Sequence, residues 1–447
     1  MSSSTTFACS ECGREHPKWQ GICGGCQAWH TIPERPVAKR SFIDGVELIP
    51  LADVDQTQSI PVPTTVEEID RVLGGGFVPG SVSLLSGEPG IGKSTLTLQL
   101  ALRIARTGAS VVLVTGEEAP TQVAARASRI HNRPIPDALS VLDTTDTRQV
   151  ISTMETHKPQ MVIVDSVQTL KSSDEGGSPG SPALLRTVAG LLADAAKKHT
   201  VSLLLIGHVT KDGGLAGPRT LEHLVDTVLS FDGDRRNDLR FLRCLKHRFG
   251  PTSESGLFEM VGTGLIPVRD PSARFLADRN PRLAGSAVVP VLDGRRPVMV
   301  EIQALVRKSA DRPSVTAHNV PSGRLNLVNS VGQDKLSSVL SGFDTLVSAA
   351  GGAKVNDPGA DMAMLLAMVS AAREMPVPAS LASCAEIGLS GELRRVTTME
   401  RRLSEAARLG FTACIVPPSC PDGPRGLELH RCETVVEALG VLLGVTV

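Results

Sequence analysis

The chain has 447 residues, of which 41% are hydrophobic, and its formal net charge is −1. This length predicts two or three domains with sizeable cores. The near-neutral charge excludes a global attraction to nucleic acid, so any DNA contact has to come from local basic surface. No apolar run reaches membrane-spanning length and no signal-peptide region is found, which predicts a cytoplasmic protein without a membrane partner.

Four of the nine cysteines form two Cys-x-x-Cys pairs near the start of the chain: Cys9 with Cys12, and Cys23 with Cys26. Two such pairs with a short spacer are typical of a tetrahedral zinc site. We therefore expect residues 1–32 to form a C4 zinc ribbon with no open position for catalysis. A pair of redox-active dithiols is the alternative.

Two histidines and two tryptophans lie close to these cysteines. His16 and His30 are expected at the surface, because four thiolates already fill a zinc site. Trp19 and Trp29 are expected to cap a core that is too small to be stable without metal. The remaining cysteines lack ligand spacing and are expected to be buried or surface thiols: Cys244, Cys384, Cys414, Cys420 and Cys432.

Residues 33–60 contain prolines and no clear periodicity, which predicts a linker. From residue 61 to 268, apolar strands alternate with helices, as in an α/β domain with a mainly parallel sheet. The expected strands are residues 82–85, 110–115, 161–165, 201–207, 227–232 and 239–246. The expected helices are residues 95–106, 121–130, 147–156 and 182–198.

A phosphate-loop motif follows the first of these strands. It consists of Gly87, Glu88, Pro89, Gly90, Ile91, Gly92, Lys93, Ser94 and Thr95. Glycines let backbone N–H groups close around phosphate oxygens, and the next helix directs its positive N-terminal end at the same anion. We expect ATP here, with Lys93 at the β- and γ-phosphates and Ser94 on Mg²⁺. A glycine-rich turn with a chance lysine is the alternative.

Two later strands end in carboxylates. The apolar strand 161–165 ends in Asp165, the pattern of a Walker B strand whose aspartate helps to hold Mg²⁺. Strand 110–115 leads to Glu117 and Glu118, and ligands of α/β sheets bind at that edge. We expect a carboxylate there, Glu117 ahead of Glu118, to polarise the attacking water. In the alternative these carboxylates cap helices or are solvated.

A histidine and a basic segment complete the expected ATPase site. His208 ends strand 201–207 and is expected to sense the γ-phosphate, although a histidine that only caps the strand is the alternative. Lys246 and Arg248 would share one face if the strand continued through them. These two cations are expected to reach a phosphate across a subunit boundary, as an arginine finger does. A solvated, charged edge strand is the alternative.

Several motifs together resemble the RadA (Sms) family of bacterial DNA repair proteins. They are residues 73–80, the phosphate loop, and residues 115–118, 208–219 and 246–250. The resemblance implies a zinc ribbon, a RecA-type ATPase core and a C-terminal Lon-protease-like domain, over nearly the whole chain. The family motif Lys-Asn-Arg-Phe-Gly is Lys-His-Arg-Phe-Gly here, with His247 in place of asparagine. The cations are kept, so their role in ATP turnover is expected to carry over.

The resemblance also extends to hexameric replicative helicases of the DnaB type, through Lys246 and Arg248. It implies a ring, expected to be a hexamer, with ATP between subunits and single-stranded DNA in the channel. Residues 172–181 and 211–219 would line that channel, because glycine-rich loops with a few cations can follow a phosphate backbone. Lys171, Lys211 and Arg219 are the expected DNA contacts.

Residues 269–447 resemble the Lon proteolytic domain, through residues 357–361 and 386–393. Lon peptidases use a serine activated by a lysine. Here Gly359 holds the serine position and Glu400 the lysine position, so we expect an inactive scaffold for oligomerisation and DNA binding. Its candidate duplex-DNA contacts are Arg307, Lys308, Arg312, Arg324, Arg394, Arg395, Arg401 and Arg402.

These expectations combine into one function. The chain is predicted to be a DNA-dependent ATPase of recombinational repair, a ring that moves along single-stranded DNA. With the RecA recombinase it would extend strand exchange at branched DNA, which rests on the family resemblance. A RecA-fold signalling ATPase that does not act on DNA is the first alternative, and an ATP-dependent protease is the second.

Overall fold

The computed structural model of the chain describes residues 6–12, 14–16, 19–31, 34–35, 59–130, 133–172, 180–208, 221–233 and 238–443. The chain divides into two compact units, Met1–Thr57 and Gln58–Val447. Among the helices in the described ranges, none is long and apolar enough to cross a membrane.

The first unit is a small three-stranded antiparallel sheet. Its strands β1 (Thr6–Ala8), β2 (Glu15–His16) and β3 (Glu34–Arg35) lie in the order β2-β1-β3. The paired cysteines lie in the turns outside these strands, at Cys9 and Cys12 and at Cys23 and Cys26. Such short strands bury little apolar surface, so we expect this unit to depend on a metal for its stability.

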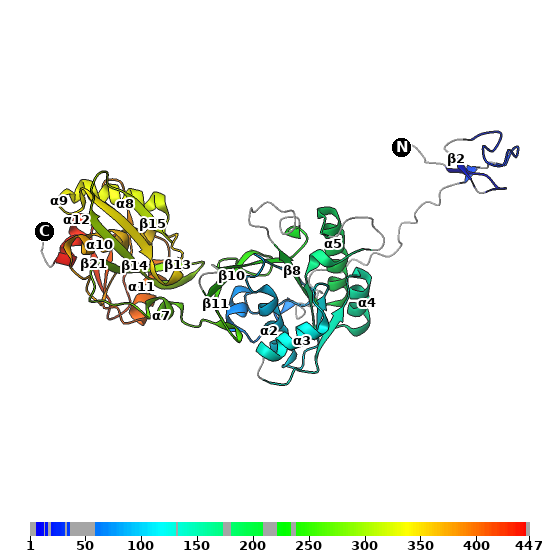
Figure 1. The fold of residues 1–447 in the computed structure, drawn as a ribbon, viewed down its shortest axis with the longest axis horizontal. Coiled ribbons are helices and arrows are strands. Elements are labelled where there is room, and N and C mark those ends of the chain that lie inside the picture. Colours follow the sequence, from blue (N-terminus) through cyan, green and yellow to red (C-terminus); the bar gives the residue numbers. More distant parts are fainter. Residues whose placement is uncertain are drawn as a thin grey trace. The chain divides into compact units, whose positions relative to one another are not determined.

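The second unit begins with a nine-stranded sheet (Figure 1). Its strands are β4 (Val82–Gly87), β5 (Val111–Thr115), β6 (Leu139–Asp143), β7 (Met161–Asp165), β8 (Ser202–His208), β9 (Thr227–Gly233), β10 (Leu239–His247), β11 (Ser255–Val261) and β12 (Gly264–Pro267). They lie in the order β12-β11-β10-β9-β4-β8-β7-β5-β6. The pairs from β9 to β6 are parallel and those from β9 to β12 antiparallel. The predicted parallel sheet is thus extended by an antiparallel edge.

The central strands are apolar without interruption because both faces of the sheet are covered. Leu85 packs in one hydrophobic core, with α2 (Lys93–Ala105) and α3 (Pro120–Ile130). Its neighbour Leu84 packs in another, with α4 (Thr147–His157) and α5 (Pro182–His199). Figure 1 shows α4 and α5 side by side. This arrangement directs the carboxyl ends of β4, β5, β7 and β8 to one common edge.

The sequence missed several elements of this domain. The helix α1 (Glu67–Val72) has only six residues, and β6 carries polar residues, so neither has a strong periodic signal. The strands β11 and β12 form an antiparallel hairpin after the basic segment and were not predicted either. The predicted helices and remaining strands lie within two residues of their observed ends.

The last domain is built on a seven-stranded sheet in the order β15-β16-β14-β13-β17-β20-β21. These strands are β13 (Ser286–Asp293), β14 (Arg296–Lys308), β15 (Val315–His318), β16 (Phe343–Ala349), β17 (Leu381–Ser383), β20 (Ala413–Val416) and β21 (Glu428–Arg431). The short strands β18 (Glu386–Ile387) and β19 (Leu393–Arg394) form a separate pair.

Six helices in the described ranges accompany this sheet: α7 (Pro271–Leu276), α8 (Ser322–Lys335), α9 (Ser337–Leu340), α10 (Asp361–Arg373), α11 (Met399–Arg408) and α12 (Val435–Leu443). The core around α10 is the largest of this domain and also contains Leu239 and Leu257 from β10 and β11. The C-terminal domain and the edge of the nine-stranded sheet therefore share apolar packing.

Candidate ATPase and zinc sites

The phosphate loop connects β4 to α2, as the motif predicted. Gly90 and Gly92 have φ values of 77° and 112°, which L side chains rarely adopt. A Cβ atom on Gly92 would also lie 2.5 Å from Cε of Met260. The helix starts at Lys93, two residues before the predicted start, so the loop closes tightly on its first turn. The N-terminal end of α2 is thereby directed at the loop.

Lys93 is buried at the base of this loop. Its Nζ atom donates hydrogen bonds to the carbonyl oxygens of Gly87, at 2.7 Å, and Glu88, at 3.0 Å. Burial lowers the pKa of the Lys93 ammonium to about 8, while the carboxylates of Asp165 and Glu117 oppose the shift. The cation is therefore largely protonated near pH 7, and the loop carbonyls hold it in place.

Three further predicted residues meet Ser94 at the edge of the sheet. Ser94, Asp165, Glu117 and Glu118 line the same small cavity. Burial raises the pKa of the Asp165 carboxyl, and a hydrogen bond with the Ser94 hydroxyl opposes that shift. A serine hydroxyl beside an aspartate provides the oxygen ligands that Mg²⁺ prefers.

The two neighbouring glutamates have different surroundings. The Glu117 carboxylate accepts a hydrogen bond from the buried hydroxyl of Ser166 at 2.7 Å, and the His208 ring lies 3.8 Å from it. The Glu118 carboxylate instead forms an ion pair with Arg126 of α3. Because its partner is a hydroxyl and not an arginine, Glu117 is favoured over Glu118 as the group that polarises water.

His208 lies at the end of β8, next to the phosphate-loop strand. Burial and the charge of Lys93 lower the pKa of its imidazole, so the ring is neutral near pH 7. Its Nδ1 atom is buried and has no hydrogen-bond partner in the described part of the chain. The ring is thus available to a further polar group at this edge.

Lys246 and Arg248 lie at the other end of the central strands, where β4 begins. His247, between them, pairs with Thr227 at the start of β9, and Thr227 pairs with Ser83 at the start of β4. Arg248 forms a 3.0 Å ion pair with Asp226, whose other carboxylate oxygen accepts the backbone N–H of Val82 at 3.0 Å. The phosphate loop follows the far end of β4, a strand of six residues that spans roughly 20 Å.

The irregularity before these two cations was not predicted. A register shift between Cys244 and Lys246 interrupts β10, and the strand ends at His247, although the backbone N–H of Arg248 still donates to the Asp226 carbonyl at 3.1 Å. The Nζ atom of Lys246 donates to the carbonyls of Glu222 and Val225, at 2.6 and 2.8 Å. The Arg248 side chain remains 53% exposed.

The four N-terminal cysteines fit a tetrahedral metal. Their sulfur atoms all lie within 4.8 Å of one another, with two Sγ–Sγ distances of 3.6 Å. Zn–S bonds of about 2.3 Å in a tetrahedron place sulfurs roughly 3.8 Å apart. Backbone N–H groups of Cys26 and Gly25 lower the pKa of the Cys23 thiol, whereas burial and the three other thiols raise the pKa of the Cys26 thiol, so the sulfur geometry carries the metal assignment.

Two expectations for the residues around the zinc site were wrong. His16 is buried, and its Nε2 atom contacts Cys23 Sγ at 3.4 Å, as a neighbour of the ligand set. Trp19 and Trp29 are 58% and 68% exposed and do not cap the core. The predicted core cap failed because the cysteine turns, with Phe7, already fill the small interior.

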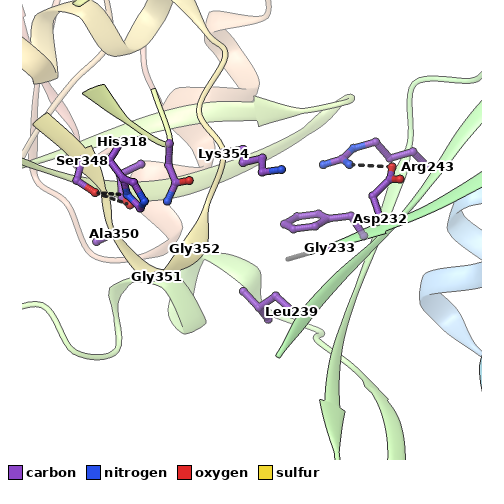
Figure 2. Close-up of a pocket in the computed structure, with 13 residues that line it drawn as sticks. Asp232, Gly233, Leu239, Arg243, His318, Ser348, Ala350, Gly351, Gly352 and Lys354 are labelled. Carbon is purple, nitrogen blue, oxygen red and sulfur yellow. Dashed lines mark hydrogen bonds and ion pairs between the residues drawn. The ribbon is translucent and has the colours of Figure 1, made fainter. Parts of the chain in front are cut away.

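A groove of about 420 Å³ lies between the end of β9, the start of β10 and the turn at residues 350–352 (Figure 2). Asp232 and Arg243 form an ion pair on one side, and His318 and Lys354 line the other. The nucleotide-site residues do not line this groove. Its lining mixes charges of both signs, and it is not part of the ATPase site.

Gly359, predicted to stand at the position of the peptidase serine, is closely surrounded by protein atoms. A Cβ on Gly359 would lie 3.1 Å from Asp357 Oδ1 and 3.2 Å from both Cys384 Sγ and a guanidinium nitrogen of Arg402. Arg402 is buried and forms a 2.7 Å ion pair with Asp357. Glu400, at the position predicted for the lysine, faces Arg395 at 3.6 Å.

This arrangement also corrects the proposed basic surface. Arg402 is buried and Arg324 is paired with Asp361 and Glu386, so both are structural. Of the predicted single-stranded DNA contacts, Lys171 is exposed, beside the start of α4. Lys211 and Arg219 lie outside the described residues, as do most of the two predicted DNA loops and the linker.

Comparisons with known proteins agree with this architecture. Family models match residues 7–34 (rubredoxin metal binding domain), 50–214 (AAA domain) and 337–423 (Lon protease (S16) C-terminal proteolytic domain). DNA repair protein RadA of Mycobacterium tuberculosis is 40% identical, with 98% of this chain and 93% of the relative covered. The RadA protein of Bacillus subtilis is 39% identical over 99% of both chains. That of Streptococcus pyogenes is 39% identical over 98% of both.

The chain belongs to the RadA family of DNA repair proteins. The RadA resemblance and the predicted three-part fold are therefore confirmed: a zinc ribbon, a P-loop ATPase core and a Lon-like domain. The cofactors are ATP with Mg²⁺ in the core and zinc in the ribbon. The fit of both sites to these groups rests on the Ser94–Asp165 oxygens and the four converging sulfurs.

Three residues that pair with predicted site residues had no motif to reveal them. Ser166 holds Glu117, Arg126 neutralises Glu118, and Asp226 binds Arg248. Ser166 is the one with a usable signal, because it directly follows the Walker B aspartate. Asp226 and Arg126 become meaningful only through their spatial neighbours.

The affinity for Mg-ATP is expected to fall as the pH rises above 8. Without nucleotide, the pKa of Lys93 is about 8. A bound phosphate favours the charged ammonium and raises this pKa. Nucleotide binding above pH 8 therefore requires the uptake of a proton. Affinity should then fall up to about tenfold per pH unit. Titration with a fluorescent ATP analogue between pH 7 and 9.5 measures this. Lys93→Arg keeps its charge and should lack the fall; a flat profile in the unmodified protein contradicts the assignment.

Replacing Cys12 by serine is expected to remove the zinc ion of the ribbon. Three thiolates bind Zn²⁺ much more weakly than four, and the unit has little core of its own. Metal analysis of the purified protein should find about one zinc per chain in the unmodified protein and close to none in the variant. Cys244→Ser, in a buried thiol of β10, serves as the control and should retain zinc. Zinc at full occupancy in Cys12→Ser would show that this thiol is not a ligand.

Proposed function

We propose that this chain is a DNA-dependent ATPase of recombinational repair. It acts as a hexameric ring that moves along single-stranded DNA and, with the RecA recombinase, promotes strand exchange and branch migration. Family membership and the AAA domain support the coarser part, an ATPase of DNA repair. The ring, the movement and the RecA partnership follow the family resemblance.

Residues of a single chain can bind ATP and its metal and can activate the attacking water. Lys93 and the loop amides bind the phosphates of ATP, and Ser94 and Asp165 hold Mg²⁺. When bound there, the metal would neutralise charge on the transferred phosphoryl group. Glu117, held by Ser166, accepts a proton from the attacking water, and His208 senses whether the γ-phosphate is present.

The position of Arg248 carries the proposal of an oligomer. Arg248 lies beside the start of β4, because its partner Asp226 binds Val82 there. The phosphate loop follows the other end of that strand, roughly 20 Å away. An arginine side chain is shorter than this, so Arg248 cannot reach the ATP of its own chain. Its half-exposed guanidinium, together with Lys246, is therefore assigned to the ATP of a neighbouring copy.

Contacts with DNA are assigned to local basic positions, because the net charge of the chain is −1. Exposed Lys171 follows the 3-10 turn η3 (Val167–Thr169), which itself follows the Walker B strand. A DNA contact there would lie a few residues from Asp165. Lys211 and Arg219 follow His208 in sequence, so the same coupling is proposed for them.

We propose that the Lon-like domain is not a peptidase. The Gly359 position has no hydroxyl, and Arg402, Asp357 and Cys384 occupy the space around it. Neither the protein nor a Gly359→Ser variant is expected to degrade α-casein with Mg-ATP present, because a lysine base is also absent from the expected position, which holds Glu400. Release of acid-soluble peptide by either protein, above a Lys93→Ala control, would contradict this.

Stimulation by single-stranded DNA tests the proposal directly. With zinc and Mg²⁺ present, poly(dT) should raise the steady-state rate of ATP hydrolysis, and added salt should reduce the effect through phosphate contacts. A Lys171→Ala variant should need more poly(dT) for half-maximal stimulation, with unchanged hydrolysis in the absence of DNA. Equal rates with and without DNA would instead favour a signalling ATPase, which is the rival function.

A further inference from the structure

One hairpin tip of the Lon-like domain packs against the ATPase core, beside the apolar contacts that the two domains share. Strands β13 and β14 pair antiparallel up to Asp293 and Arg296, with Gly294 in the turn at φ 64°. A Cβ on Gly294 would lie 2.1 Å from the Ser253 carbonyl oxygen, so the turn packs directly against the chain before β11. The hairpin tip therefore presents its side chains to the edge of the ATPase sheet.

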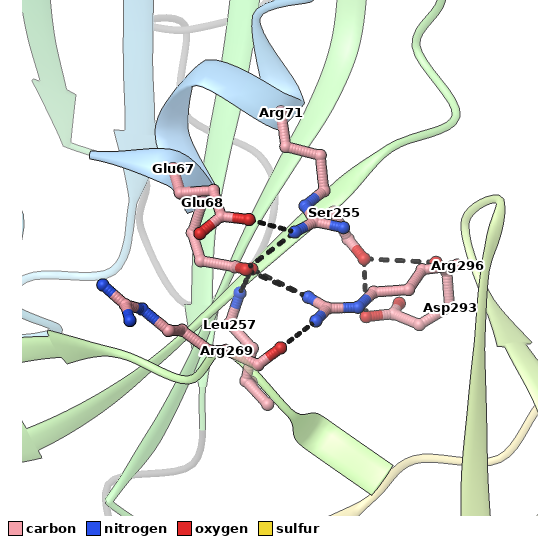
Figure 3. A network of polar contacts seen from close by, with 8 residues as sticks. All are labelled: Glu67, Glu68, Arg71, Ser255, Leu257, Arg269, Asp293 and Arg296. Carbon is pink, nitrogen blue, oxygen red and sulfur yellow. Dashed lines mark hydrogen bonds and ion pairs between the residues drawn. The ribbon is translucent and has the colours of Figure 1, made fainter. Parts of the chain in front are cut away.

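The central contact of this tip is the pair Glu68–Arg296, shown in Figure 3. Glu68 of α1 is completely buried, and Arg296 donates to both of its carboxylate oxygens, at 2.9 and 3.2 Å. The backbone N–H of Leu257 in β11 donates to the same carboxylate at 3.0 Å. Arg296 also donates to the Arg269 carbonyl in the interdomain segment, at 2.6 Å.

A second residue of the tip holds the neighbouring strands. The Asp293 carboxylate accepts a hydrogen bond from Ser255 of β11 at 2.8 Å and faces Arg243 of β10 at 3.4 Å. Its position beside Arg296 can be followed in Figure 3. The tip thus contacts α1, β10 and β11, which are three adjacent elements of the ATPase edge.

Two of these elements lead to the same point. Helix α1 ends at Val72, and the carbonyl of the next residue, Leu73, lies 3.1 Å from Nε2 of His247. The other ring nitrogen of His247 lies 2.9 Å from the Thr227 hydroxyl. Strand β10 itself ends at His247, between Lys246 and Arg248. A shift of α1 relative to β10 would therefore strain the Leu73–His247 contact, which lies between the two cations.

We propose that Glu68 and Arg296 form an interdomain latch through which the Lon-like domain positions Lys246 and Arg248 for ATP hydrolysis. The latch deepens the proposed function, because it rests on the intersubunit role of those two cations. Glu68 and Arg296 touch neither nucleotide nor metal, so they are positioning residues. The C-terminal domain, which lacks the peptidase groups, thereby acts in the ATPase cycle.

Arg296→Gln tests the latch in the full-length, zinc-loaded protein with Mg-ATP and poly(dT). Because misplacing a catalytic group by a fraction of an ångström slows the chemistry, kcat should fall about tenfold while KM for ATP changes less than about twofold. Arg71→Gln is the matched control: it removes the other cation on Glu68, at 3.3 Å, but leaves the link between domains. It should keep kcat.

A double variant separates positioning from stability. Arg296→Gln alone leaves the buried Glu68 charge undercompensated and should lower Tm, whereas Glu68→Gln with Arg296→Gln removes both charges and should recover it. The kcat of the double variant should remain low, because two neutral amides do not restore the link. Recovery of kcat together with Tm, or an equal loss in Arg71→Gln, overturns the latch.

The same assay distinguishes the latch from the function on which it rests. If the Arg248→Ala variant keeps full kcat, the proposed role of the two cations is wrong, and so is the latch that depends on it. If Arg248→Ala has a low kcat but Arg296→Gln has a normal kcat, only the latch is overturned. If both act through one segment, adding Arg296→Gln to Arg248→Ala should cause no further loss, and a multiplied loss contradicts the proposal.

Discussion

Replacing Glu117 by glutamine is expected to lower the kcat of ATP hydrolysis by about 100- to 1,000-fold, because the amide cannot accept a proton from water. The substitution keeps the size of the side chain, and the Ser166 hydroxyl can still donate to the amide oxygen. Nucleotide binding should therefore persist, and KM should change little. Steady-state hydrolysis with saturating DNA and binding of a fluorescent ATP analogue measure the two quantities.

Glu118→Gln is the matched control for this prediction. Its carboxylate lies one residue away, lines the same cavity and is paired with Arg126. A loss of less than about tenfold is expected, since the role of this pair is to hold α3. If kcat falls more in Glu118→Gln than in Glu117→Gln, Glu118 and not Glu117 is the residue that polarises water.

Mixing Arg248→Ala with Glu117→Gln is expected to restore ATP hydrolysis that neither variant has alone. In the proposed ring, each interface would combine the Glu117 of one subunit with the Arg248 of its neighbour. Random assembly of equal amounts leaves roughly a quarter of the interfaces with both residues intact. The rate of DNA-stimulated hydrolysis, measured after mixing at low concentration and reassembly, should rise toward that fraction.

The outcome separates action within one chain from action between chains. If Arg248 served the nucleotide of its own chain, no chain in the mixture would have both residues, and no activity would return. Subunit exchange is verified by giving the two variants different affinity tags and capturing one tag, which should bring down the other variant. Failure of complementation despite verified exchange would place Arg248 outside the neighbouring site.

Local patterns predicted much of the fold. The strand at residues 161–165 was predicted with its observed bounds, because a strand buried on both faces is apolar at every position. The prediction missed β6 and α1, whose polar or short sequences carry no such signal. The irregularity at Leu245, which interrupts β10, was equally invisible, because it depends on how β9 and β10 pair.

Side-chain surroundings were predicted less well than backbone. Trp19 and Trp29 were expected to cap a small core and are exposed, while His16 was expected at the surface and is buried. Residue type alone favours tryptophan inside and histidine outside, but in a unit this small the metal-binding turns decide what is buried. Arg324 and Arg402 were grouped with surface cations for the same reason, although carboxylates from distant segments pair with them.

The sequence by itself determined the chemistry that depends on close spacing along the chain. The residues from Gly87 to Thr95 specify a phosphate loop, and Cys9, Cys12, Cys23 and Cys26 specify a metal site. Such motifs work because covalent spacing alone brings their groups together. The tertiary structure decided that Glu117 faces Ser166 and that Arg248 lies at the edge away from its own phosphate loop. It alone brought together Glu68 and Arg296, 228 residues apart, because only the folding of two sheets against each other makes them neighbours.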